Sequence, residues 1–278
     1  MVRVLLPMGL AFIMFSLGLG LKTADFRRVL RRPGAIGIGL VAQMLLLPLT
    51  AAGIAILLEL PGVWAVGLMI LAASPGGVTA GIVTRLAGGD TALSISLTVF
   101  TSLLAFVSVP LIVGAGLELF GSGATVVRLP PGQTAGGLLL VTLLPVTLGL
   151  WASERGIFAV QARALVHRLA TGVFLLIVVI TFIDQWSAIS RHFADIGLAA
   201  LSLNLITMAT GFLLGRVLGL PVAGRLALSM ECGIQNSALG ITLAVSVLGA
   251  PELAIPSVIY ALLMNITAFA VIGYRRLR

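Results

Sequence analysis

Long apolar runs alternate with short polar breaks along the whole chain. The runs are continuous and do not alternate residue by residue, so they predict helices rather than barrel strands. Each is close to the ~20 residues that a helix needs to cross a bilayer. Nine such runs lie at roughly 4–21, 34–58, 63–86, 91–116, 133–153, 165–184, 194–215, 223–248 and 253–274. The pattern predicts an all-α integral membrane protein of about nine transmembrane helices, with residues 1–278 forming a single polytopic domain.

The composition supports this fold class and excludes others. The chain is 59% hydrophobic, only 9% of its residues are charged, and its mean hydropathy is +1.19. So few charges cannot cover the surface of a soluble domain of 278 residues. We therefore expect the lipid bilayer as the surrounding medium, with no nucleic acid and no obligatory protein partner.

The 17 basic residues predict the topology. When the loops are assigned alternately to the two sides with the N-terminus outside, 14 of them fall on the cytoplasmic side and 3 outside. Because cytoplasmic loops carry the excess of Lys and Arg, we expect a multi-pass protein of the inner cell membrane with a cytoplasmic C-terminus. The outer set is Arg3, Arg128 and Arg191, and the cytoplasmic set is Lys22, Arg27, Arg28, Arg31, Arg32, Arg85, Arg155, Arg163, Arg168, Arg216, Arg225, Arg275, Arg276 and Arg278.

Two of the runs are interrupted near their middles. The sequence Ser74–Gly77 breaks the third run by removing a backbone donor and adding flexible residues, and Glu231–Asn236 breaks the eighth. One further run follows each broken run, which fits two inverted repeats, about 1–117 and 130–278, with the first repeat truncated. Paired interruptions of this kind are typical of the binding site of a secondary transporter.

Glu231 is the acidic residue that lies well inside an apolar run, whereas the other acidic residues lie in breaks or at helix ends. A carboxylate at this depth is costly, so it faces protein or a water-filled cavity and has a partner. The sequence has no Lys or Arg at similar depth, so a bound cation or a proton is the predicted partner. The alternative is a protonated Glu231 that is hydrogen-bonded between helices.

Neutral polar residues accompany this carboxylate. Gln235 follows Glu231 in the same broken run, and Gln43 lies mid-run in the second. Ser94 and Thr98 are four apart in the fourth run, so they share a helix face. Amide, hydroxyl and freed backbone carbonyl oxygens beside one carboxylate suit a hard cation such as Na⁺. For the two hydroxyls, bonding to their own helix or to a neighbouring helix is the alternative.

The interruptions also offer a place for an anion. Freed N–H groups that begin the half-helix after Gly77 form a positive end inside the membrane, and we expect the same near Asn236. A plain kink filled by neighbouring side chains is the alternative for the Ser74–Gly77 break. Asn265 lies mid-run in the last helix, where it contacts substrate or bonds a neighbouring helix.

These motifs resemble those of the bile acid:sodium symporter family. The matches are Ser74–Gly77, Glu231–Ser237, and Lys22–Arg28 leading to Arg32 and Pro33. The similarity covers nearly the whole chain, and three motifs in order are specific together. It implies the nine-helix form of the family fold, with a panel domain and a core domain in which two discontinuous helices cross.

The resemblance implies two sodium sites behind the crossing, with Glu231 shared by both. Gln235 and Gln43 are expected to serve one site, together with the backbone carbonyls of Cys232 and Ile234. Ser94 and Thr98 are expected to serve the other. The residues expected to contact substrate at the crossing are Gly77, Val78, Thr79, Asn236 and Asn265.

One departure from the family pattern affects the site at Ser94 and Thr98. Family members with that site complete usually carry a Ser-Asn pair after Pro-Gly-Gly, whereas this chain has Ala80 and Gly81. A hydroxyl and an amide ligand are therefore missing. The loss of these two ligands leaves three alternatives. The chain binds one cation only, the site at Ser94 and Thr98 is completed by Thr79 or water, or transport is coupled to protons through Glu231.

The sequence thus predicts a sodium-coupled symporter of an organic anion, bile-acid-like or a small carboxylate, that works by alternating access. A proton-coupled or sodium-independent carrier of the same fold is the alternative. An intramembrane hydrolase is disfavoured because Glu231 has no second acid at depth, and His167 and His192 lie near loops. A closed midplane site also fits the paired broken helices better than an open channel does.

Overall fold

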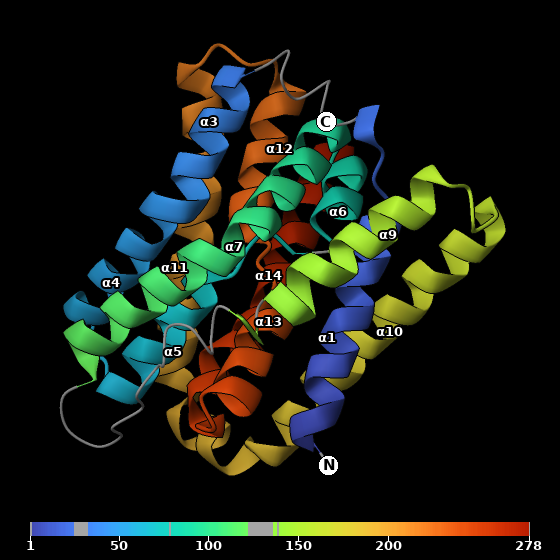
Figure 1. The fold of residues 1–278 in the computed structure, drawn as a ribbon. Coiled ribbons are helices and arrows are strands. Elements are labelled where there is room, and N and C mark those ends of the chain that lie inside the picture. Colours follow the sequence, from blue (N-terminus) through green and yellow to red (C-terminus); the bar gives the residue numbers. More distant parts are fainter. Residues whose placement is uncertain (1, 25–32, 78, 122–135, 138, 278) are drawn as a thin grey trace.

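The computed structural model describes residues 2–24, 33–77, 79–121, 136–137 and 139–277. Within these ranges the structure is helical, and its strand-like pairing is a single isolated bridge between Gly76 and Gln235. Figure 1 shows the helices as roughly parallel rods, with α1 beginning at the end of the molecule opposite to the end where α14 finishes. The predicted all-helical class is confirmed.

The uninterrupted helices form most of the molecule. Five described helices are long and apolar enough to cross a membrane by length and composition. Their bounds are Pro33–Leu57, Thr91–Phe120, Val160–Asp184, Trp186–Val217 and Pro251–Arg276. The first of these comprises α3 (Pro33–Val41), a π-helical turn (Ala42–Leu46) and α4 (Leu47–Leu57). The others are α7, α10 and α11 in order, and α14 (Ile255–Arg276) preceded by a 3₁₀ turn (Pro251–Ala254).

Two further helices, α1 (Val2–Leu19) and α9 (Leu144–Glu154), pack against each other very closely. A Cβ built on Gly18 would lie 3.0 Å from the Cα of Gly149, and a Cβ on either residue would overlap the backbone of the other helix. Small residues allow this approach between membrane helices. Figure 1 shows α1, α9 and α10 side by side along one flank of the molecule.

Both predicted interruptions are present. The third run divides into α5 (Gly62–Ala73) and α6 (Ala80–Leu86), and the eighth into α12 (Val222–Gly233) and α13 (Ser237–Thr242), which continues as a π-helical turn (Leu243–Val247). Figure 1 shows α6 and α12 in the upper half and α5 and α13 in the lower half. The two broken helices therefore run in opposite directions and meet at their breaks.

The breaks are joined by backbone hydrogen bonds. The N–H of Gly77 donates to the carbonyl of Ile234 at 2.7 Å, and the N–H of Asn236 donates to the carbonyl of Pro75 at 2.9 Å. Backbone polar groups in a membrane interior must be paired within the protein. Each break thus satisfies backbone groups that the other break leaves free.

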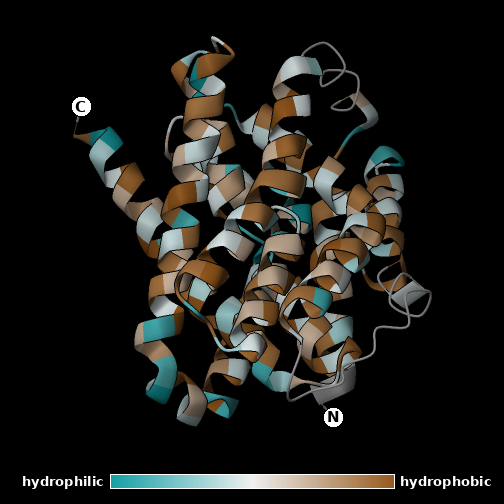
Figure 2. Cartoon of the chain, turned by 90° about the vertical axis from the view of Figure 1, so that its left-hand side faces the viewer, coloured by the Kyte–Doolittle hydropathy of each residue, from teal (hydrophilic) through white to brown (hydrophobic). Residues whose placement is uncertain are grey.

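The outer faces of the helices are apolar. Figure 2 shows hydrophobic residues along the rods, with hydrophilic residues concentrated at the two ends. On α10, the side chains of Leu169, Leu175 and Ile183 are more than half exposed. Exposed leucines in such numbers are expected where lipid replaces water. A multi-pass membrane protein is the class that this surface fits, whereas the nine crossings and the inverted repeats stay predictions.

One predicted break is present but shorter than expected. The polar stretch Asp184–His192 is helical except at Gln185, since α10 ends at Asp184 and α11 begins at Trp186. The side chain of His192 lies against the ring of Trp64, with 5.4 Å between ring centroids. The predicted run 165–184 ends where α10 ends, whereas α11 begins eight residues before the predicted run 194–215. Polar side chains at a membrane surface do not require an irregular backbone.

Candidate functional site

Glu231 is fully buried in the last turn of α12. Two hydroxyls from α7 donate to its carboxylate: Ser94 Oγ to Oε2 at 2.7 Å, and Thr98 Oγ1 to Oε1 at 2.5 Å. Ser94 and Thr98 are one turn apart on one helix face, as predicted. The carboxylate therefore accepts two short hydrogen bonds from neutral groups.

The hydroxyl cluster extends further, to Thr84 on α6. Thr84 Oγ1 donates to Ser94 Oγ at 3.2 Å, and both side chains are inaccessible to solvent. Ala80 lies one turn before Thr84 in α6 and is also fully buried. The Ala80 methyl brings no oxygen to this side of the site, so the polar groups here are the three hydroxyls.

The amides Gln43 and Gln235 hold the backbone at the end of α12. Gln43, in the π-helical turn of the second rod, donates its Nε2 to the carbonyl of Glu231 at 2.7 Å. Gln235 donates its Nε2 to the carbonyl of Cys232 at 2.8 Å and, over 3.4 Å, to that of Glu231. Both side chains are at least 96% buried, since Gln43 is 4% and Gln235 1% exposed.

Each of these amides has an oxygen that is buried without a hydrogen-bond partner in the described part of the chain: Oε1 of Gln43 and Oε1 of Gln235. An amide oxygen can only accept, and a buried acceptor left unpaired costs free energy. A cation is a partner that would satisfy both oxygens at once. The residues of the predicted sodium site therefore fit such an ion by their chemistry.

The break of the third run closes over the carboxylate. A Cβ on Gly76 would overlap Oε1 of Glu231 and would lie 3.3 Å from Nε2 of Gln43. A residue without a side chain is required where the backbone passes this close. Gly76 thus lets the α5–α6 break form one wall of the site.

The Cys232 and Ile234 carbonyls, predicted as sodium ligands, are both engaged. That of Cys232 accepts from Gln235, and that of Ile234 accepts from the N–H of Gly77. A carbonyl oxygen has two lone pairs, so each retains one further acceptor position. The predicted ligand set around Glu231 is therefore brought together by contacts from three separate rods.

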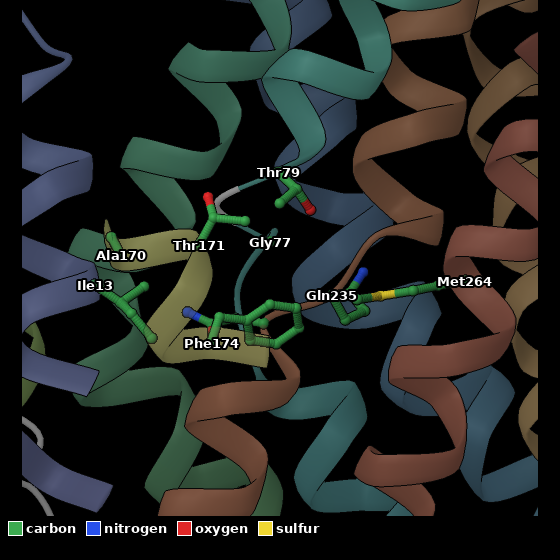
Figure 3. A pocket seen from close by; sticks show the side chains of 9 residues that line it. Ile13, Gly77, Thr79, Ala170, Thr171, Phe174, Gln235 and Met264 are labelled. Atoms are coloured by element: carbon green, nitrogen blue, oxygen red, sulfur yellow. The ribbon is translucent and has the colours of Figure 1, made fainter. Parts of the chain in front are cut away.

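A cavity adjoins this cluster (Figure 3). Its lining comes from α1, α10, α14 and the two breaks, and consists of Ile13, Gly77, Thr79, Ala170, Thr171, Phe174, Gln235, Asn236 and Met264. None of these residues is charged. Gln235 belongs both to the cavity wall and to the amide pair beside Glu231, so the cavity and the candidate cation site share a side chain.

The residues predicted to contact substrate divide into three groups. Gly77, Thr79 and Asn236 line the cavity. Val78 lies outside the described residues. Asn265 is not among the lining residues, and its Nδ2 donates to the carbonyl of Ala261 in its own helix at 2.6 Å. A substrate role for Asn265 stays a prediction.

At the N-terminal end of α13, fewer N–H groups are left to bind an anion than the sequence predicts. Asn236 caps α13, accepting the N–H of Leu239 on its Oδ1 at 3.1 Å. One of the donors that the break frees is therefore already used. The Nδ2 of Asn236 has only a 4.0 Å contact with the sulfur of Met14, which leaves this donor next to the cavity.

Two polar residues at or beside the site are not part of the sequence prediction. Thr84 extends the hydroxyl cluster, and Asn204 on α11 bonds the carbonyl of Gly233 at 2.7 Å from the far side of α12. A polar residue in an apolar run equally often bonds its own helix. A mid-run Asn is the stronger signal, because a buried amide must find several partners.

Comparison with known proteins gives a consistent result. The model of the Sodium Bile acid symporter family matches residues 7–192. The "Uncharacterized sodium-dependent transporter YocS" of Bacillus subtilis (strain 168) is 33% identical over 273 residues, which cover 95% of this chain and 81% of that protein. These residues extend the similarity beyond 192, over most of the second half of the chain.

More distant relatives are longer. The "Probable sodium/metabolite cotransporter BASS2, chloroplastic" of Oryza sativa subsp. japonica is 29% identical over 278 residues, covering 99% of this chain and 64% of that protein. The "Ileal sodium/bile acid cotransporter" of Oryctolagus cuniculus is 25% identical over 234 residues, 84% of this chain and 67% of that protein. This chain thus spans about two thirds of their length. All three are named as transporters and not as enzymes.

Proposed function

This chain belongs to the sodium bile acid symporter family, and from that premise we propose that it is a sodium-coupled symporter of an organic anion. Sodium-dependent transport is what its relatives are named for. The observation that carries the proposal for this chain is the pair of unpartnered amide oxygens, on Gln43 and Gln235, beside the buried Glu231.

The donor set favours sodium over other cations. One carboxylate, two amide oxygens and backbone carbonyls are hard oxygen ligands, which suit an alkali or alkaline-earth cation. The side chains that donate to the carboxylate in the described part of the chain are the hydroxyls of Ser94 and Thr98, so no described basic side chain balances its charge. A single monovalent cation would balance it, with Glu231, Gln43 and Gln235 as ligands and the carbonyls of Cys232 and Ile234 completing the shell.

The substrate is an organic anion that binds in the neighbouring cavity. Its lining combines apolar walls, such as Phe174 and Met264, with the donors of Asn236 and Thr79. Neutral donors and no basic side chain suit an anion whose charge is offset by the co-transported cation. A bile-acid-like molecule or a small carboxylate fits this description, in keeping with the metabolite and bile acid cargo of the named relatives.

Alternating access follows from the division of the helices. We assign α1, α9 and α10 to a panel domain and the two broken helices with their neighbours to a core domain. The cavity lies between them, because it is lined by α1 and α10 on one side and by both breaks on the other. Rocking of one domain against the other would open it to each side in turn. Nine crossings, inverted repeats, an outer N-terminus and an inner-membrane location belong to this proposal.

Thermal stability in detergent is the first test. Purified protein is titrated with NaCl against choline chloride at constant ionic strength, for wild type and for Glu231→Gln. A ligand that binds only the folded state raises the melting temperature by mass action. A sodium-specific rise in the wild type that disappears in Glu231→Gln is the expected result. Equal curves for sodium and choline in the wild type would contradict sodium binding.

A proton-coupled or sodium-independent carrier of the same fold is the second candidate. It is favoured by the hydrogen-bonded chain in which Thr84 donates to Ser94 and Ser94 donates to the carboxylate of Glu231. It is also favoured by Ala80 and Gly81, which bring no cation ligand. Uptake into proteoliposomes distinguishes the two candidates. Accumulation that follows a pH gradient and ignores a sodium gradient would favour this second one.

A further inference from the structure

The carbonyls at the end of α12 are divided between two sets of partners. Those of Glu231 and Cys232 accept from the amides of Gln43 and Gln235. The next carbonyl, that of Gly233, accepts from Asn204 Nδ2 at 2.7 Å and from the hydroxyl of Tyr260 at 2.9 Å. An α-helix turns by about 100° per residue, so the carbonyls of residues 231 and 233 lie on roughly opposite sides of the helix axis.

Asn204 and Tyr260 reach Gly233 from separate helices, α11 and α14. Both side chains are fully buried, and they bond each other over 3.2 Å. A Cβ on Gly233 would overlap Met208, so the absence of a side chain there allows α11 to come within reach of the carbonyl. Together, Asn204 and Tyr260 form a two-sided clamp on the carbonyl of Gly233.

The orientation of the clamp is determined by its partners. The carbonyl of Gly233 can only accept, so the nitrogen of the Asn204 amide must face it. The oxygen of that amide accepts the hydroxyl of Thr267 at 2.6 Å, on the other side. The second N–H of the amide donates to the hydroxyl of Tyr260, so every polar atom of the Asn204 side chain is bonded to α12 or α14.

We propose that Asn204 and Tyr260 are positioning residues for the cation site: by clamping the carbonyl of Gly233, they hold the end of α12 so that the Glu231 and Cys232 carbonyls and the Glu231 carboxylate face the amides. This rests on the proposed function, in which those groups surround sodium. The clamp touches none of the proposed ligand atoms, and acts through the backbone of the α12 break.

The reason lies in the geometry of the break. After Gly233 the chain leaves the helix, since Ile234 is extended, with φ −108° and ψ 99°. The helix therefore supplies no later N–H to bond these carbonyls. Without the clamp, the carbonyl of Gly233 would be a buried acceptor without a partner, and the end of α12 would rotate to find one. Glu231 lies two residues away and would move with it.

Equilibrium binding of ²²Na⁺ to the purified full chain tests the clamp. Tyr260→Phe removes one donor with little change in shape, Asn204→Leu removes the other at similar side-chain size, and the double variant removes both. We expect each single variant to raise the half-saturating sodium concentration about threefold to tenfold, the effect of one lost hydrogen bond. The double variant is expected to exceed the product of the two, because each single variant keeps one donor on Gly233.

The control is Thr181→Val, which deletes a buried hydroxyl of α10 that bonds only the carbonyl of Ile177 at 2.8 Å. The melting temperature of every variant in choline chloride reports on the fold alone. A clamp variant that melts lower but binds sodium with wild-type half-saturation would overturn the inference, because its role would then be structural. Tyr260→Phe keeps the test open if Asn204→Leu does not fold.

The wild type separates this inference from the proposed function. If the wild type binds ²²Na⁺ and Glu231→Gln does not, the proposed function stands and the clamp variants decide the inference alone. If the wild type shows no sodium-specific binding, both the proposed function and the clamp's role in it are overturned.

Discussion

Glu231 has different polar groups on its two sides. On the hydroxyl side, Ser94 and Thr98 donate directly to the carboxylate, and Thr84 supports Ser94. On the amide side, Gln43 and Gln235 donate to the backbone and leave their oxygens unpartnered. The hydroxyl side already satisfies its own polar groups, whereas the amide side contains acceptors that still need a positive partner. The comparison teaches that burying many polar groups does not by itself make a cation site.

The difference also predicts how many cations this chain takes up. A cation on the amide side would gain two oxygens that are otherwise costly to bury. A cation on the hydroxyl side would have to displace hydrogen bonds that are already made, and Ala80 and Gly81 would bring it no compensating ligand. We therefore expect one sodium ion per cycle, bound on the amide side.

The largest effect is expected at the carboxylate common to both sides. Glu231→Ala and Glu231→Gln remove the charge that balances the cation, and we expect sodium-driven uptake to fall at least about a hundredfold, as loss of one partner of a buried charge pair does. Uptake of radiolabelled taurocholate or pyruvate into proteoliposomes under a sodium gradient measures this. Glu252→Gln, which neutralises an exposed carboxylate, is the control. Full uptake by Glu231→Ala would show that the carboxylate has no role in sodium coupling.

The next largest effect is expected on the amide side. Gln43→Leu deletes an unpartnered oxygen and a bond to the Glu231 carbonyl, so we expect the half-saturating sodium concentration to rise about tenfold to a hundredfold. Sodium titration of the melting temperature measures it. Gln43 does not line the cavity, so substrate half-saturation at saturating sodium should stay close to wild type. An unchanged sodium requirement would show that the amide oxygens are not ligands.

A smaller effect is expected on the hydroxyl side. Ser94→Ala and Thr98→Val each remove one hydrogen bond from a carboxylate that keeps another, so we expect sodium half-saturation to change only about threefold to tenfold. The same titration serves, with Ser96→Ala as the control, since Ser96 bonds its own helix at the carbonyl of Ala92. If these variants lose more sodium affinity than Gln43→Leu does, sodium binds on the hydroxyl side and not on the amide side.

The smallest expected effect is a gain in the sodium cooperativity of uptake. Ala80→Ser with Gly81→Asn adds a hydroxyl and an amide to the hydroxyl side, and we expect the sodium dependence of uptake to become steeper, from a Hill coefficient near one to a value above one. The Cβ of Asn at 81 would lie 3.0 Å from Cγ1 of Ile95, so Ile95→Ala, which removes that atom, is included to make room. A Hill coefficient near two in the wild type would contradict the expected single cation.

The sequence predicts the fold class and most of the site for identifiable reasons. Apolar runs reveal helices because lipid demands internally paired backbone. Glu231 stands out because a carboxylate is rare at that depth. The two breaks are visible because Pro75 and the glycines near it weaken a helix, and because Glu231 is followed by two amides.

Other features can be identified only from the three-dimensional structure. Thr84 joins the site only because α6 and α7 pack together, and its side chain looks like any threonine in an apolar run. The roles of Gln43 and Gln235 were expected, but the fact that their nitrogens hold backbone while their oxygens stay unpaired follows from geometry alone. The start of α11 at Trp186 could not be predicted from the sequence, because solvent at the membrane surface tolerates polar residues on a regular backbone.

The pairing of the two breaks has a consequence for how this protein is made. Residues 75–77 find their backbone partners in residues 234–236, about 160 positions later in the chain. When the first broken helix leaves the ribosome and enters the membrane, the second one does not yet exist. Until then, the polar backbone at Pro75–Gly77 must stay in water, in the insertion machinery or in a temporary hydrogen-bonded pairing, because hydrocarbon gives it no hydrogen-bond partner. Synthesis of residues 234–236 is thus the step that allows residues 75–77 to settle in the bilayer.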